Sequence, residues 1–238
     1  MATSGSSNYS VSRDDIINRV LRILGVLAQG GTATATQISE AAIALNGLTK
    51  ALEADGMPLW GITQYAHTMT ASTRTYRIGV GQTVNIVKPL KIIGAFLRKT
   101  SSSIDSPVMI VTKDEYNKLG NKFITGIPNI LYYDPQRVYG DLALYPVPDT
   151  TTASGYTLQI VYQRTFEDFD SASDEADFPQ EWFDALTFLL ADRLSTEYGL
   201  PLEIKNDLAR RAIQYKAEAL SFGTEEGSFY FQPDRRMY

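Results

Sequence analysis

The spacing of apolar residues changes twice along this chain of 238 residues, and this limits the folds that it can adopt. Residues 1–59 and 166–222 repeat apolar side chains every three or four positions, which is typical of amphipathic helices. Residues 60–165 contain alternating runs such as Tyr156–Gln163, which are typical of strands. A β segment between two helical segments predicts an α+β fold.

The first helical segment, residues 1–59, predicts a hairpin of two helices. Ser12 has an acidic residue three positions later, which is the pattern of a capping box at a helix start. The pair Gly30-Gly31 is expected to end this helix. Thr34 or Thr36 can begin the second helix.

The second helical segment, residues 166–222, predicts an acidic linker followed by another helical hairpin. Pro179 suits the first position of one helix, and Pro201 opens the other. A single amphipathic hairpin cannot bury its apolar stripe, so the two hairpins are expected to pack together as a helical bundle. Residues 60–165 then form an inserted module whose ends lie close together.

The inserted module is predicted to be an antiparallel β-sandwich or barrel, because its short strands are regularly spaced. Asp105-Ser106-Pro107 and Asp134-Pro135 are interpreted as turns. Thr112 with Glu115 is expected to cap one short helical turn. The predicted strands are Thr75–Ile78, Ile92–Leu97, Val108–Val111, Ile130–Tyr133, Leu142–Tyr145 and Tyr156–Gln163.

The composition argues against several classes of function. The chain has no cysteine, so a disulfide, a thiolate nucleophile or a Cys-ligated metal is excluded. The single histidine, His67, excludes a two-histidine metal site within one chain. A net charge of −5 argues against nucleic-acid binding by bulk electrostatics. We therefore expect no cofactor, no metal ion and no catalytic residue.

Targeting signals are also not found. No apolar run approaches the roughly 20 residues that span a bilayer. The N-terminus lacks the basic start and apolar core of a signal peptide. We expect a protein that is made in a cytoplasm and does not bind membranes.

Two features of the sequence leave an alternative function open. The segment from Glu167 to Glu181 has seven acidic residues and no basic one, so it is either a solvated linker or a source of paired carboxylates. It lacks the spacing of an EF-hand. The tyrosines of residues 60–165 could bind sugar, although core packing also explains them. The alternative is a cell-wall glycoside hydrolase or a sugar-binding virion module.

The last segment, residues 223–238, is predicted to be an extended tail that becomes ordered on a partner. It has no periodicity, yet it is rich in aromatic residues, unlike an ordinary flexible tail. Aromatic and arginine side chains dominate interface hot spots, which favours a partner groove over packing on the chain's own bundle. The candidate partner-binding residues are Phe222, Phe229, Tyr230, Phe231, Arg235, Arg236 and Tyr238.

Short motifs occur in a recognisable order between about residue 14 and residue 222. They are Ala44–Leu48, Asp55–Trp60, Tyr76–Gly81, Lys88-Pro89, Gly126–Pro128, Leu131–Pro135, Leu144–Pro148, Phe178–Trp182 and Glu197–Gly199. Their order resembles that of the head-to-tail adaptor proteins of tailed bacteriophages. The most similar group is the tail accessory, or packaged-DNA-stabilisation, proteins of short-tailed phages.

The resemblance implies a structural protein without catalytic activity. It implies a ring, commonly of twelve copies, that docks under the portal protein and closes the DNA-filled capsid. Such a ring offers a platform to the downstream tail or nozzle protein, and double-stranded DNA passes through it without sequence-specific binding. The helical part is expected to face the portal, with the C-terminal tail in portal clefts. The implied location is the head-tail junction of the virion.

Overall fold

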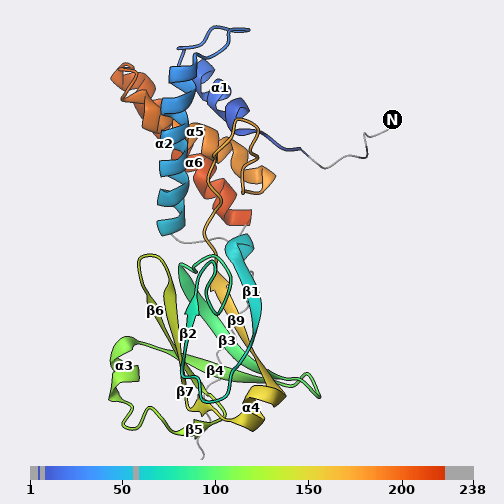
Figure 1. The fold of residues 1–238 in the computed structure, drawn as a ribbon. Helices are drawn as coiled ribbons and strands as arrows, with labels where there is room; N and C mark the ends of the chain where they lie inside the picture. The colour runs from blue at the N-terminus through green and yellow to red at the C-terminus, as the bar shows by residue number, and fades with distance from the viewer. Residues whose placement is uncertain (1–4, 6–8, 56–58, 223–238) are drawn as a thin grey trace, which may run out of the picture. The chain divides into compact units, whose positions relative to one another are not determined.

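The computed structural model describes residue 5, residues 9–55 and residues 59–222. The fold is mixed α+β, as predicted, with six α-helices and a curled seven-stranded sheet among these residues (Figure 1). The chain divides into two compact units. Met1–Thr49 and Asp168–Tyr238 form what we call the helical unit, and Lys50–Glu167 form the β unit. The four-segment division made from the sequence stays a prediction.

Helix α1 (Arg13–Ile23) begins with the predicted capping box. The Ser12 side chain accepts a hydrogen bond from the Asp15 backbone N–H, and the Asp15 carboxylate accepts one from the Ser12 backbone N–H. The prediction that Gly30-Gly31 ends this helix is wrong. The chain leaves the helix at Gly25, whose φ of +72° lies in the left-handed region that glycine tolerates.

Helix α2 (Ala35–Ala54) begins after Thr34, which resolves the choice between Thr34 and Thr36. The Thr34 hydroxyl accepts a hydrogen bond from the Gln37 backbone N–H, and the Gln37 side chain accepts one from the Thr34 backbone N–H. This is again a reciprocal capping box, with glutamine in place of glutamate. The boundary between the two units falls within α2, between Thr49 and Lys50.

The C-terminal helices are α5 (Phe183–Ser195) and α6 (Leu202–Phe222), and α5 contacts both α1 and α6. Pro179 does not begin an α-helix directly, because its carbonyl closes a 3-10 turn, η2 (Gln180–Trp182), before α5 starts. The rings of Phe188 and Tyr215 stack at 4.9 Å between α5 and α6. The buried residues of α5 lie around most of the helix, which is typical of a central helix.

The β unit contains one large sheet in the order β1-β9-β3-β4-β6-β7-β2. A separate two-stranded sheet pairs β5 (Thr125–Gly126) with β8 (Val147–Pro148). The unit also contains η1 (Leu59–Gly61), α3 (Lys113–Lys118) and α4 (Thr150–Gly155). The strands of the large sheet are β1 (Ile62–Thr68), β2 (Thr75–Ile78), β3 (Lys91–Lys99), β4 (Asp105–Val111), β6 (Ile130–Pro135), β7 (Gly140–Tyr145) and β9 (Tyr156–Gln163).

The predicted strands are all present, but the sheet is not purely antiparallel. Strands β4 and β6 pair in parallel, with Ile110 opposite Leu131. Parallel strands need a long crossover connection, and residues 112–129, which contain α3 and β5, provide it. Thr112 and Glu115 form the predicted capping box of α3.

Two predicted turns are strand residues instead. Asp105-Ser106-Pro107 begins β4, because the Asp105 carboxylate pairs with the Arg98 guanidinium across the ladder at 2.7 and 2.8 Å. Asp134-Pro135 ends β6, and the hairpin turn follows it at residues 136–139. A local turn propensity was overridden in both places by pairing with a neighbouring strand.

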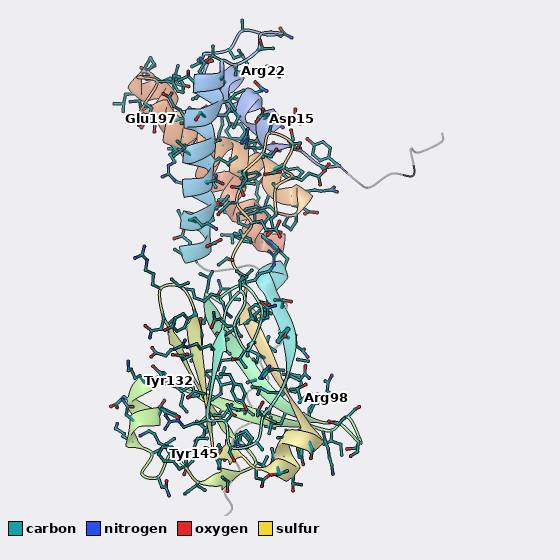
Figure 2. All side chains as sticks on the ribbon, viewed as in Figure 1. Asp15, Arg22, Arg98, Tyr132, Tyr145 and Glu197 are labelled. Carbon is teal, nitrogen blue, oxygen red and sulfur yellow. The ribbon has the colours of Figure 1, made fainter. Side chains whose placement is uncertain are left out.

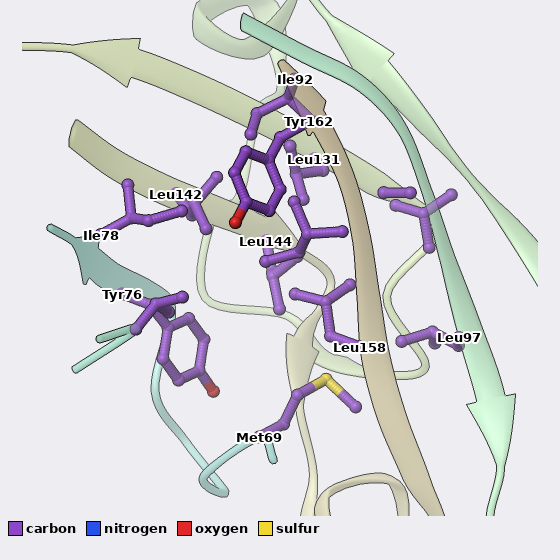
Figure 3. Packing of buried hydrophobic residues seen from close by; sticks show 14 residues of the cluster. Met69, Tyr76, Ile78, Ile92, Leu97, Leu131, Leu142, Leu144, Leu158 and Tyr162 are labelled. Carbon is purple, nitrogen blue, oxygen red and sulfur yellow. The ribbon is translucent and has the colours of Figure 1, made fainter. Parts of the chain in front are cut away.

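The inner face of the curled sheet forms the core of the β unit (Figure 3). Leu158 and Ile160 of β9 are completely buried in this core. Tyr76 of β2 reaches into the same core with Met69 beside it. Apolar residues from distant parts of the chain therefore bury one common face, which is what holds a sheet of this kind together.

Candidate interaction surfaces

The predicted partner-binding tail follows directly from helix α6. Phe222 is the last residue of that helix. The other six candidates, Phe229, Tyr230, Phe231, Arg235, Arg236 and Tyr238, lie outside the described residues. Their role therefore stays a prediction.

Helix α6, which precedes that segment in the sequence, packs into the helical unit. Leu208, Ala212 and Ala219 are buried on the side of α6 that packs into the unit. On the exposed side, Asp207 pairs with Arg210 and Arg211 within one turn. The hydrogen bond from Arg210 is the main reason that the pKa of Asp207 lies below its ordinary value. Ion pairs between residues three or four positions apart stabilise the helix that carries them.

The acidic segment is folded against the helical unit and is not a free solvated linker. The Asp174 carboxylate accepts hydrogen bonds from the backbone N–H groups of Asp170 at 2.8 Å and Ser171 at 2.5 Å. The Asp174 carbonyl in turn accepts one from the backbone N–H of Arg13 at 2.8 Å. The segment also carries two aromatic side chains that are buried, Phe169 and Phe178. Burial of these rings explains why a charged segment folds back.

Polar side chains of α2 bind the chain where it returns from β9, and no local pattern in the sequence predicts these contacts. Asn46 both donates to the Phe169 carbonyl at 3.2 Å and accepts from its N–H at 2.9 Å. The buried Glu53 carboxylate accepts from the Phe166 N–H at 2.6 Å. The Lys50 ammonium contacts both the Phe166 carbonyl, at 3.0 Å, and Glu53, at 3.1 Å. These contacts satisfy backbone groups that would otherwise lose their hydrogen bonds on burial.

Two surface pockets among the described residues each contain too few carboxylates for a catalytic pair. One surface pocket is lined by Tyr9, Glu175 and Phe178, and another by Lys50 and Glu53, with one carboxylate in each. A glycoside hydrolase needs two carboxyl groups about 5–10 Å apart across a cleft. Within residues 9–55 and 59–222, no three His, Asp or Glu side chains are grouped to hold a metal ion. The hydrolase alternative is therefore not supported.

The tyrosines of the β unit are used for packing, which does not favour a sugar site. Tyr132 of β6, labelled in Figure 2, lies in the β unit. Its ring stacks on that of Tyr116 of α3, with centroids 5.3 Å apart. The Tyr133 hydroxyl donates to the Pro89 carbonyl at 2.8 Å, and burial raises its pKa to about 12. Tyr139 lies under the Arg77 guanidinium at 4.5 Å. Each ring has a partner within the fold.

Charge is distributed unequally between the two units. The β unit has 12 Lys and Arg against 9 Asp and Glu, which gives a formal charge of +3. The helical unit, counted over its full sequence, has 10 Lys and Arg against 18 Asp and Glu, which gives −8. The net charge of −5 therefore conceals a strongly acidic unit and a mildly basic one. Such a difference affects which charged partners each unit attracts.

Comparisons with known proteins identify the family of the chain. None of the described helices is both long enough and apolar enough to cross a bilayer. A search of curated proteins finds no match. The model of the SU10 adaptor protein family matches residues 11–224, which include all of the described helices and strands. The predicted resemblance to phage head-to-tail adaptors is confirmed at this level, and the chain belongs to the SU10 adaptor protein family.

Proposed function

We propose that this protein is a structural head-to-tail adaptor of a tailed bacteriophage. It forms a ring under the portal protein, closes the DNA-filled capsid and provides the platform on which the tail is built. The observation that carries the proposal is the family match over residues 11–224, which extends through both the helical unit and the β unit. The protein acts by binding and has no catalytic role.

The partners follow from that position in the virion. They are the portal protein, neighbouring copies in a ring of twelve, and a downstream tail or nozzle protein. In this arrangement the two helical hairpins pack as one bundle, and the β module is inserted between them. Double-stranded DNA passes through the ring without sequence-specific contacts. The acidic helical unit supports this, because carboxylates do not hold phosphates. Assembly takes place in the host cytoplasm, and the finished ring stays at the head-tail junction.

The C-terminal tail is the proposed anchor in the portal. Phe222, Phe229, Tyr230, Phe231 and Tyr238 would fill apolar clefts, and each buried aromatic side chain contributes about 1–3 kcal/mol. Arg235 and Arg236 would donate hydrogen bonds to carboxylates or carbonyls of the portal. The conformational entropy that the tail loses when it becomes ordered offsets part of this binding free energy. Repetition around a ring turns modest affinity per tail into durable attachment.

A truncation tests the anchor. A chain that ends at Phe222 should fold normally, because the described helices and strands are complete by that residue. It should lose binding to purified portal rings in co-sedimentation. Two variants of the full chain test whether the aromatic residues are responsible. The triple alanine variant of Phe229, Tyr230 and Phe231 should lose binding to the portal. The control, the double alanine variant of Glu225 and Glu226, should keep it. Full binding by the truncated chain would contradict the anchor.

A further inference from the structure

Helix α6 carries a second row of apolar side chains besides the row that packs into the helical unit. The buried row includes Leu208, Ala212 and Ala219, and the residue directly after each of them is also apolar. Successive residues are turned by about 100° around an α-helix, so the second row lies on a different side of α6. We call this second row the α6 stripe, and its members are Leu202, Ala209, Ile213 and Leu220.

The large side chains of the α6 stripe are open to solvent. Leu202 is 72% exposed, Ile213 is 71% exposed and Leu220 is 37% exposed. Single exposed apolar residues are ordinary, but a row of them along one side of a helix is typical of a surface that another segment covers. With a rise of 1.5 Å per residue, the stripe is about 27 Å long from Leu202 to Leu220. An extended segment of several residues can therefore lie along it.

A segment that can cover the stripe begins at the end of the same helix. Helix α6 ends at Phe222, and the tail, residues 223–238, follows it. The other residues outside the described part of the chain, 1–4, 6–8 and 56–58, include no aromatic residue. The tail, in contrast, contains the uncharged aromatic segment Phe229–Phe231. Aromatic side chains bury a large apolar area, which suits them to an exposed row of Leu and Ile.

The tail is long enough to reach the stripe. Ile213 lies nine residues before the end of α6, which is about 14 Å back along the helix axis. An extended chain spans about 3.3 Å per residue, so Phe229 can lie up to about 23 Å from Phe222. Gly223 directly follows the helix, and glycine is the usual residue where a chain changes direction at that position. Both the stripe and the attachment of the tail belong to α6, so this helix alone sets the required reach.

We propose that the segment Phe229–Phe231 folds back onto the α6 stripe in the unassembled protein and leaves it when the tail binds its partner. In an extended segment Phe229 and Phe231 point to the same side, so both rings can contact the stripe around Ile213. A tethered segment has an effective concentration of about millimolar, so the chain's own tail occupies the stripe before another copy at micromolar concentration. The stripe and the aromatic segment then cover each other, and each would otherwise favour aggregation.

The consequence for assembly rests on the proposed function. The portal can bind only the fraction of the chain whose tail has left α6, so the apparent affinity for the portal is reduced by that fraction. Ile213→Gln weakens the stripe and should therefore raise the rate of portal binding. Alanine variants of Phe229 and Phe231 remove the proposed anchor itself and should lower it. The two claims therefore predict opposite changes.

Disulfide trapping on the chain alone tests the contact, because the chain has no cysteine of its own. Ala209→Cys is combined with Ser228→Cys or with Gln232→Cys, which leaves Ile213 and all three aromatic residues in place. The control is Gln214→Cys with the same tail variants. Gln214 is exposed on another side of α6 and lies closer to the tail along the helix, so the tether alone favours the control.

We expect intrachain disulfides to form at least about fivefold faster with Ala209→Cys than with Gln214→Cys at low protein concentration. Equal rates would overturn the proposal. Disulfides that form only between chains would also overturn it, because they would show that the stripe binds a second copy.

Limited proteolysis gives a second, independent test without cysteines. Chymotrypsin should cleave within Phe229–Phe231 at least about fivefold faster in Ile213→Gln than in the wild type, because a released tail is accessible more of the time. The Ile213 side chain is largely exposed, so this variant should fold normally. Gln214→Ala is the control and should be cleaved like the wild type. Equal cleavage of Ile213→Gln and the wild type would overturn the proposal. No portal is present, so that failure would leave portal binding to be decided by its own experiment.

Discussion

At the residue scale, the one histidine of the chain is a structural residue of the β core. The His67 ring meets the Tyr76 ring edge to face, with centroids 4.8 Å apart. Tyr76 is fixed in turn, because its hydroxyl donates to the Thr70 carbonyl and accepts from the Thr70 N–H, both at 3.0 Å. The His67 Nε2 atom has no hydrogen-bond partner within the described residues. Burial lowers the pKa of His67 below its ordinary value, which favours the neutral ring.

This environment predicts a specific dependence of stability on pH. In the unfolded chain His67 takes up a proton near its ordinary pKa of 6.5, whereas the folded chain resists protonation until a lower pH. The free energy of unfolding should therefore be highest above about pH 6.5 and fall below it, by at most about 1.4 kcal/mol per pH unit. Urea unfolding of the wild type and His67→Phe between pH 7.5 and 5 measures this. Phenylalanine keeps a ring beside Tyr76 but cannot titrate, so parallel pH curves would contradict the explanation.

At the element scale, local signals were predictable and long-range contacts were not. The capping boxes at Ser12 and Thr112 lie within four residues, and the structure confirms both. The hydrogen bond between Asn46 and Phe169 joins residues that are 123 positions apart in the sequence, and no pattern near either residue predicts it. Asp105 was interpreted as a turn residue from its local sequence alone. It belongs to a strand through its pairing with Arg98 on β3, which the local sequence does not indicate. The C-terminal candidate site could be predicted only from its amino-acid composition. Aromatic content indicates that a segment can bind a partner, but not where on the partner it binds.

The β6–β7 hairpin gives a prediction at the same scale. A Cβ atom at Gly140 would overlap the Tyr133 ring, whose hydroxyl is held by the Pro89 carbonyl. Gly140→Ala should therefore displace that ring and lower the free energy of unfolding by about 1–3 kcal/mol, the usual cost of overpacking a core. Gly120→Ala is the matched control, because a Cβ atom there meets open space. Equal thermal unfolding of the two variants would contradict this view of the hairpin.

At the scale of the whole molecule, the two units differ in composition as well as in fold. The helical unit is acidic and leads into the aromatic tail, whereas the β unit is mildly basic and is built on a seven-stranded sheet. Different surfaces of this kind suit a protein that joins unlike partners, because each unit can recognise its own partner by charge and shape. The family match through both units supports the same role. The central claim is therefore that the chain assembles on a portal.

Native mass spectrometry tests that claim most directly. The chain is measured alone and then mixed with portal rings from the same virus, over a range of ratios. We predict a complex of fixed stoichiometry in which a full ring of adaptor copies, expected to be twelve, is bound to one portal ring. The absence of a complex at every ratio, with both proteins folded, would contradict the account.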